Sequence, residues 1–230
     1  MKKSFHLFTL LLFASVVLHS CELFETEDVD DKASPHPASR MTIPNRQLTE
    51  AEIAQYVADY WEIGGHSDFQ LEVIRLVNNI RREHNLEPVQ IDDRLMIAAR
   101  FYAQTMVQLN GGNIGHNIGP YAVPGATHGA SRNIAEAFGA RLRWNGGNAA
   151  GGNVSPEKLV DMWMNSEGHR RYILSPEHRY GGTGSYAGGR FGACHYLFLS
   201  DNPNPITSAT VVQLNYLQKS QQRKTNILTN

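Results

Sequence analysis

The sequence predicts an α+β domain in which helices and strands occupy separate stretches of the chain. Three amphipathic helical patterns follow one another between residues 49 and 109. A further capped helix comes later, and two apolar strand patterns then meet at Gly188 and Gly189. Helices that precede a β-hairpin, without regular alternation of strand and helix, are typical of α+β rather than parallel α/β folds.

Each of the first three helices has its own start signal. Thr49 and Glu52 have the form of a capping box, and Ser67 repeats the signal with Gln70. Asp92 is a suitable first residue for the third helix. Apolar residues then recur at helical spacing in the three segments: Ile53, Val57 and Tyr60; Leu71, Ile74, Val77 and Ile80; Leu95, Ala99, Tyr102, Met106 and Leu109.

The middle of the chain is rich in glycine and asparagine. Residues 110–130 form an expected long loop that contains His116 and His128, and loops of this length in compact domains are often functional. Ser131 is expected to cap a short helix that ends near Phe138. Residues 143–153 predict a flexible low-complexity loop.

The segment after Ser155 is the most informative part of the chain. Ser155-Pro156 predicts a helix start, and we expect this helix to end at Gly168 because glycine adopts left-handed backbone angles without strain. Residues 179–187 and 191–200 are then expected to form the hairpin, and residues 210–214 a further short strand.

The N-terminus predicts export. Residues 1–20 begin with two lysines and continue with a short apolar run, as secretory signal peptides do. Leu18-His19-Ser20-Cys21 resembles a bacterial lipobox, so we expect lipidation at Cys21 and a disordered polar tether over residues 21–47. The alternative is an ordinary signal peptide followed by an incidental cysteine.

Charge and cysteine content exclude several classes of protein. The net charge is −1 and no basic stripe is present, so we expect no nucleic-acid partner. Of the two cysteines, lipidation would leave only Cys194, which rules out an intrachain disulfide in the mature protein. Cys194 lies among aromatic residues of an expected strand, which favours a buried side chain over a catalytic thiol.

Several short motifs follow one another between residue 70 and about residue 200. They are Leu76-Val77-Asn78, the segment from Arg81 to Val89, Asn133-Ile134-Ala135, the segment from Asn165 to Arg170, and the Gly-Thr-Gly hairpin. In this order and spacing they resemble the bacterial form of the CAP superfamily, also called SCP (cysteine-rich secretory, antigen five and pathogenesis-related proteins). The resemblance implies a three-layer α-β-α sandwich with a small antiparallel sheet. We place this domain at residues 48–217, followed by a flexible tail at residues 218–230.

The resemblance also implies a surface cleft. Many members of the family place two histidines and two glutamates there, and some bind a divalent metal. By position, His116 matches the first histidine, His195 the second, and Glu167 falls near the second glutamate. The position of the first glutamate holds Arg132 instead, which removes a carboxylate and adds a positive charge that disfavours a metal. An Arg132–Glu167 ion pair that closes the site is a further possibility.

Structural roles remain open for most of these residues. His116 also fits an ordinary loop histidine, and His195 a half-buried strand histidine. His169 belongs to the expected cleft residues, but we interpret it as structural, bonding backbone groups where a helix ends. We expect His128 and His178 to be surface residues.

Three functions from different classes are consistent with these observations. The first is a non-enzymatic lipoprotein, anchored to a membrane on the extracytoplasmic side (periplasm or cell surface), whose cleft binds a lipid, an envelope component or a protein partner. The second is a metal-dependent hydrolase in which His116 and His195 hold zinc and Glu167 acts as general base. The third is an architectural surface protein that contacts partners through residues 110–130 and 143–153.

Overall fold

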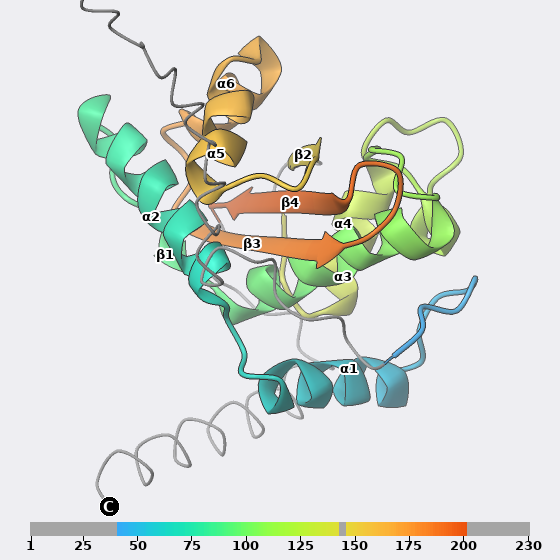
Figure 1. The fold of residues 1–230 in the computed structure, drawn as a ribbon. Helices are drawn as coiled ribbons and strands as arrows, with labels where there is room; N and C mark the ends of the chain where they lie inside the picture. Colours follow the sequence, from blue (N-terminus) through green and yellow to red (C-terminus); the bar gives the residue numbers. More distant parts are fainter. Residues whose placement is uncertain (1–40, 143–145, 202–230) are drawn as a thin grey trace, which may run out of the picture. The chain divides into compact units, whose positions relative to one another are not determined.

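The computed structural model describes residues 41–142 and 146–201, and these residues form helices on both faces of a small sheet (Figure 1). The elements in chain order are α1 (Glu50–Glu62), α2 (Asp68–Glu83), β1 (Gln90–Ile91), α3 (Asp93–Leu109), the 3-10 helix η2 (Gly119–Tyr121), α4 (Gly129–Ala137), β2 (Asn148–Gly151), α5 (Pro156–Met164), α6 (Glu167–Ile173), β3 (Tyr180–Ala187) and β4 (Ala193–Ser200).

The sheet has the strand order β1-β3-β4-β2. The predicted hairpin forms its centre, with β3 and β4 antiparallel from Tyr180 opposite Ser200 to Ala187 opposite Ala193. β2 is antiparallel to β4, but β1 pairs with β3 in the parallel sense. The sheet is therefore mixed rather than purely antiparallel as expected, because the chain enters β1 from α2 in the same direction as β3.

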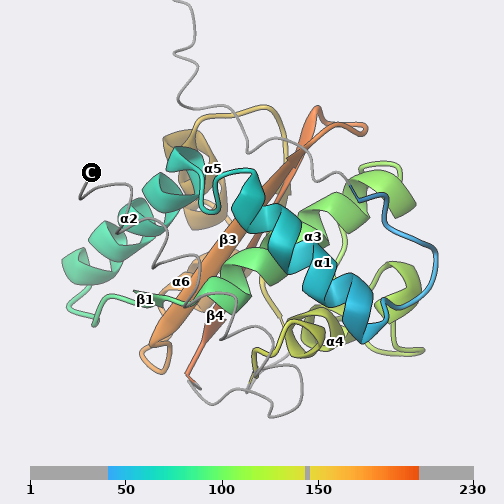
Figure 2. The same cartoon turned by 90° about the horizontal axis from the view of Figure 1, so that it is seen from below.

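Two hydrophobic clusters cover the two faces of this sheet and confirm the α+β sandwich. Successive strand residues point to opposite faces, so Tyr196 and Phe198 join one cluster while Leu197 and Leu199 join the other. The first cluster contains the buried faces of α1, α3 and α4, and the second those of α2, α5 and α6. Figure 2 shows α1 and α3 lying over β3 and β4 on the first face.

The starts of α1, α2 and α3 are those that the sequence predicts. Thr49 and Ser67 both form complete capping boxes, with Glu52 and Gln70 respectively. The Asp92 side chain accepts a hydrogen bond from the backbone N–H of Arg94 at the start of α3. These local signals suffice because each satisfies backbone donors that the helix itself leaves free.

α3 packs unusually close to β3, and two glycines make this possible. A Cβ atom on Gly182 would lie 2.2 Å from the backbone nitrogen of Met96. One on Gly184 would lie 2.0 Å from the backbone nitrogen of Arg100. Any side chain at these two positions would push the helix away from the sheet.

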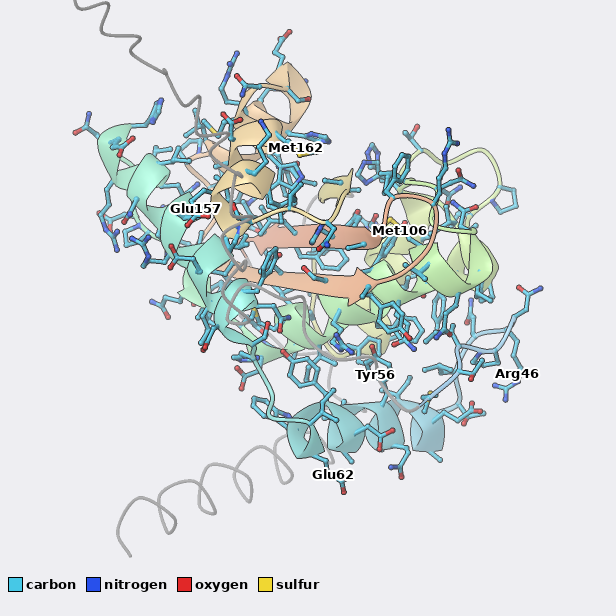
Figure 3. The ribbon with its side chains drawn as sticks, viewed as in Figure 1. Arg46, Tyr56, Glu62, Met106, Glu157 and Met162 are labelled. Atoms are coloured by element: carbon cyan, nitrogen blue, oxygen red, sulfur yellow. The ribbon has the colours of Figure 1, made fainter. Side chains whose placement is uncertain are left out.

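The domain begins before residue 48. Ile43 is only 2% exposed and its N–H donates to Oε1 of Gln108 over 2.7 Å, while Nε2 of Gln104 donates to the carbonyl of Met41. Residues 41–43, which the sequence assigned to the tether, therefore pack on α3. Figure 3 shows Tyr56 of α1 pointing toward α3, where its hydroxyl donates to Gln104.

Three local expectations are wrong. Gly168 does not end a helix: α5 stops at Met164, and Gly168 is the second residue of α6. Ser131 lies inside α4, which begins earlier, after His128. Residues 148–151 form β2 instead of a loop, because Gly147 and the small residues of β2 let this edge strand pack beside β4.

Other expectations lie outside the described residues. These are the signal peptide at residues 1–20, the lipidated Cys21, the tether up to residue 40, the strand at 210–214 and the tail at 218–230. No helix in the described part of the chain combines the length and the apolar character needed to cross a bilayer.

Candidate functional site

His116 lies in the long loop after α3, and Asn117 holds this loop in shape. The Asn117 side-chain amide donates to the carbonyls of Val123 and Ala126, both at 2.8 Å. Its carbonyl oxygen accepts from the backbone N–H groups of Val123 and Ala130. These four hydrogen bonds connect the middle of the loop to its second half and to the start of α4, so the backbone beside His116 has a fixed position.

The His116 ring is oriented by a short chain of hydrogen bonds. Its Nδ1 lies 3.0 Å from the hydroxyl of Tyr196, which lies 2.6 Å from the hydroxyl of Ser131. Ser131 in turn donates to the backbone carbonyl of His116 over 3.1 Å. Because a carbonyl can only accept, the single hydroxyl hydrogen of Ser131 is spent there.

The remaining hydrogens in this chain then have only one arrangement. The Tyr196 hydroxyl must donate to Ser131, and His116 must donate from Nδ1–H to Tyr196. The lone pair of the neutral ring therefore sits on Nε2 of His116. This nitrogen makes no hydrogen bond with any described residue and is able to accept one from a ligand.

His128 and His169 complete a group that we call the histidine cluster (His116, His128 and His169). The His116 and His128 rings have centroids 4.6 Å apart. Burial, together with smaller contributions from repulsion by His128 and His169, lowers the pKa of His116 to about 4. Burial also lowers the pKa of His128 and of His169. The cluster is therefore a group of uncharged imidazoles at neutral pH.

His195 does not join this cluster. It is 0% exposed, and its ring stacks on Phe69 of α2 with centroids 5.4 Å apart. Its neighbour Tyr196 faces His116, so His195 points to the opposite face of β4. The expected pair of facing imidazoles is thus not formed.

Both ring nitrogens of His195 are already in use. Nε2 lies 2.7 Å from the carbonyl of Gly152 and must donate to it, so Nδ1 carries the lone pair. That lone pair accepts a hydrogen bond from the Ser185 hydroxyl at 2.7 Å. His195 therefore has no electron pair left for a metal ion.

Glu167 and Arg132 also fall outside the arrangement expected from the sequence. The Glu167 side chain is 85% exposed at the start of α6, and its ion-pair partner is Arg171, 4.0 Å away. Arg132 lies on α4 beside Ser131 and makes no ion pair with Glu167. The closing Arg132–Glu167 pair is not formed, and Glu167 has no contact with the histidine cluster that would make it a general base.

The described residues do not fit a metal. No group of three or more His, Cys, Asp or Glu side chains between 41 and 142 or between 146 and 201 is arranged to hold a metal ion. The histidine cluster also contains no carboxylate. We therefore derive no chemical step through a metal at this site.

Two further residues differ in how well the sequence predicts them. Cys194 is fully buried, and burial raises the pKa of its thiol to about 11, so it is a core residue. His178, expected at the surface, is only 3% exposed and packs against Tyr172. This expectation is wrong because the polar sequence around His178 gives no sign that the chain folds back over the ring.

Sequence reasoning missed four residues of the site. The sequence predicts His128 at the surface and Ser131 as a helix cap, and it gives no signal for Asn117; Tyr196 is a core residue as its strand pattern indicates, but nothing marks its hydroxyl as part of a site. The spacing of Ser131 and Asn117 from His116 gives no periodic signal, since their hydrogen bonds link a loop, a helix and a strand. Only the alternation along β4 indicates that Tyr196 and His195 face opposite ways.

The fold and site together define an α-β-α domain with a cluster of uncharged imidazoles beside the central sheet. The family described as "CAP: Cysteine-rich secretory protein family" matches residues 74–199, and the chain belongs to this family.

Individual relatives match only parts of the chain. "Uncharacterized protein YkwD" of Bacillus subtilis (strain 168) is 34% identical over 118 residues, which is 51% of this chain and 42% of that protein. The chain thus spans less than half the length of this relative.

Two solved structures are also similar. An extracellular protein containing a SCP domain from Bacillus anthracis str. Ames has 21% identity and a TM-score of 0.43, over 57% of this chain and 40% of that one. An outer surface protein from Borrelia burgdorferi has 18% identity and a TM-score of 0.46, over 56% of this chain and 90% of that one.

Proposed function

We propose that this CAP domain is a non-enzymatic binding protein whose histidine cluster holds the polar, hydroxyl-bearing part of a ligand. The ligand is a lipid, a cell-envelope component or a surface-exposed group of a protein partner. The protein acts on the extracytoplasmic side, where Cys21 carries the lipid that anchors it to a membrane. The observation that carries the proposal is the unused lone pair on Nε2 of His116.

The electrostatics of the cluster favour an uncharged ligand group. His116 has a pKa of about 4 and is neutral at pH 7. A neutral ring with hydrogen on Nδ1 offers Nε2 as an acceptor, which suits a hydroxyl or amide donor. An acceptor that is already held in place by Tyr196 loses little entropy when it binds such a donor.

Apolar side chains beside the cluster suit the remainder of an amphipathic ligand. Ile114, two residues before His116, is 36% exposed, and Val123 is 37% exposed. Val123 packs against Gly129, next to His128. Polar groups at the centre with exposed hydrocarbon beside them are what a binding site for a lipid or a modified glycan needs.

The hydrolase alternative needs chemistry that this arrangement does not supply. His195 has no lone pair for zinc, and Glu167 points into solvent. A general base must lie within hydrogen-bonding reach of the group from which it takes a proton. Binding without catalysis requires none of these groups and uses the residues that the fold brings together.

The binding proposal is tested by thermal unfolding in the presence of panels of lipids, sterols and envelope glycans. We expect at least one hydroxyl-bearing ligand to raise the melting temperature of the wild-type protein and to lose this effect in His116→Ala. His84→Ala is the matched control, because His84 is an exposed histidine at the end of α2. No shift with any ligand, or an equal shift in His116→Ala, would overturn the proposal.

The anchoring part of the proposal has its own test. Cells that express the full chain or its Cys21→Ser variant are fractionated after labelling with a radioactive fatty acid. We expect label and membrane association in the wild type, and neither in Cys21→Ser. Membrane association that survives the substitution, without label in either chain, would remove the lipid anchor and leave the ligand-binding proposal untouched.

A further inference from the structure

A second concavity lies on α6, the helix that also carries His169, but His169 does not line it. It has a volume of about 380 Å³ and is lined by five residues: Gly168, Arg171, Tyr172, Ser175 and His178. The first three share one face of α6 because they lie three and four residues apart. The other two belong to the connection from α6 to β3, so this pocket sits where the helix ends.

Two aromatic rings give the pocket a firm apolar wall. The Tyr172 hydroxyl donates to the carbonyl of Leu199 at 2.9 Å and accepts from its N–H at 2.8 Å. These bonds fix the Tyr172 ring against β4. The His178 ring meets it edge to face with centroids 4.9 Å apart. A planar apolar group has a rigid surface to pack against.

A buried positive charge lies directly behind this wall. Arg81 is 0% exposed and donates to the carbonyls of two pocket residues, Ser175 at 2.9 Å and His178 at 3.0 Å. Its other donors bond the carbonyls of Ile173 and Glu87. Among the described residues it has no carboxylate partner, so its hydrogen bonds are satisfied while its charge is not.

A second guanidinium stands at the rim. The Arg171 side chain is 79% exposed, and its contact with Glu167 is a loose one at 4.0 Å. The acids that influence the His178 ring are Asp201 and Glu177. Burial and the charge of Arg81 lower the pKa of His178 to about 4, so this ring adds no charge of its own at neutral pH.

Unused hydrogen-bonding groups complete the site. Nδ1 of His178 is buried and has no hydrogen-bond partner among the described residues. The Ser175 backbone is engaged with Arg81 and Tyr172, but its hydroxyl bonds none of the described residues. The Ser175 hydroxyl is therefore the hydrogen-bonding group of the pocket that a ligand can use.

We propose that this α6 pocket binds a small carboxylate that carries a planar apolar group. The apolar group packs between Gly168 and the Tyr172 and His178 rings, and the carboxylate lies toward the Arg171 guanidinium and the Ser175 hydroxyl. Charge from Arg81 selects an anion over a neutral compound of the same shape. None of the pocket-lining residues belongs to the histidine cluster, so the proposal does not depend on the function proposed there.

The ligand chemistry is tested by isothermal titration calorimetry on the full chain in detergent, with phenylacetate as the probe. Phenylacetamide has the same shape without the charge, and acetate has the charge without the ring. We expect saturable binding of phenylacetate with a dissociation constant on the order of 1 mM, as suits a ligand of this size in an open pocket. Both comparison compounds should bind at least fivefold more weakly. Equal binding of phenylacetate and phenylacetamide would overturn the anion preference.

The location is tested with three variants. Gly168→Leu fills the pocket without a clash, because no atom lies within 4 Å of a Cβ placed there, and it should abolish binding. Arg171→Gln should weaken phenylacetate about fivefold and leave phenylacetamide unchanged. Arg170→Gln is the matched control, since Arg170 is also exposed on α6 but does not line the pocket, and it should change nothing.

Thermal melting of each variant shows whether it is folded. A folded Gly168→Leu protein that binds phenylacetate like the wild type would refute the proposal, whatever Arg171→Gln does. Equal weakening by Arg170→Gln and Arg171→Gln would also refute it, because the effect would then be the general charge of α6 rather than the pocket.

Discussion

His116 and His195 lie on opposite faces of β4. Both are histidines, but their ring nitrogens have different hydrogen-bond partners. His195 lies under α2 with hydrogen on Nε2, and both of its nitrogens are bonded to the protein. His116 lies beside α4 with hydrogen on Nδ1, and its Nε2 is left for a ligand. Both rings are uncharged at neutral pH, because burial lowers the pKa of each.

The difference teaches that an available lone pair, rather than residue type, distinguishes a binding histidine from a structural one. Both residues match histidine positions of the family, and burial alone would point to His195 as the functional histidine. Counting hydrogens through Ser131, Tyr196 and Ser185 separates them. Three tests break or sharpen this comparison.

The largest effect is expected from His195→Ala. The substitution removes two buried hydrogen bonds and the stacking on Phe69, and it leaves a cavity beside β4. We expect it to lower the free energy of unfolding by about 3 kcal/mol. Urea denaturation measures this, and His116→Ala, which removes one hydrogen bond from a half-buried ring, should cost less than half as much. Equal losses of unfolding free energy in the two variants would contradict the conclusion that His195 is the structural histidine of the pair.

Lowering the pH is expected to have an intermediate effect on the free energy of unfolding. The folded pKa of His116 is about 4, below its ordinary value of 6.5, so between these pH values the unfolded chain holds the additional proton. The contribution of His116 is therefore fully present above pH 6.5 and is lost as the pH falls toward 4. After allowance for solvent screening, we expect this loss to be about 2 kcal/mol.

The share of His116 in the acid effect is found with His116→Asn. The Asn amide can keep the donor bond to Tyr196 but does not titrate. The decline in unfolding free energy between pH 7 and pH 4 should become shallower in this variant and stay unchanged in His84→Asn. A wild-type slope in His116→Asn would assign the acid sensitivity to other groups, such as His178.

The smallest effect on stability, about 1 kcal/mol, is expected from Ser131→Ala. Without the Ser131 acceptor, the buried Tyr196 hydroxyl satisfies itself by donating to Nδ1 of His116, which moves the ring hydrogen to Nε2. Nitrogen-15 NMR of the His116 ring reports this change of tautomer directly. A ring that keeps its hydrogen on Nδ1 would show that the hydroxyl chain does not set the tautomer.

The sequence predicts the fold well because short residue patterns determine where most of its helices begin and where the hairpin turns. The capping boxes at Thr49 and Ser67, the Asp92 helix start and the hairpin are confirmed, although the hairpin turn extends from Gly188 to Gly192. β1 and β2 were missed because strands of two and four residues are too short for a periodic pattern to appear.

The candidate site is less predictable because it depends on contacts between distant parts of the chain. His116 and Tyr196 are 80 residues apart, and Ser131 and Tyr196 are 65 apart. No local pattern shows that Tyr196, and not His195, faces the loop. Charge at Glu167 was visible in the sequence, but its exposure on α6 follows only from the way that helix docks.

The two glycines of β3 tie the evolution of this strand to that of α3. Gly182 and Gly184 have no room for even one methyl group, since the backbone of the facing helix already occupies that space. A substitution at either site therefore requires α3 to move away from β3 and the core residues between them to repack at the same time. In a library of random variants, survivors should accumulate changes on the outer face of α1 while these two codons stay fixed.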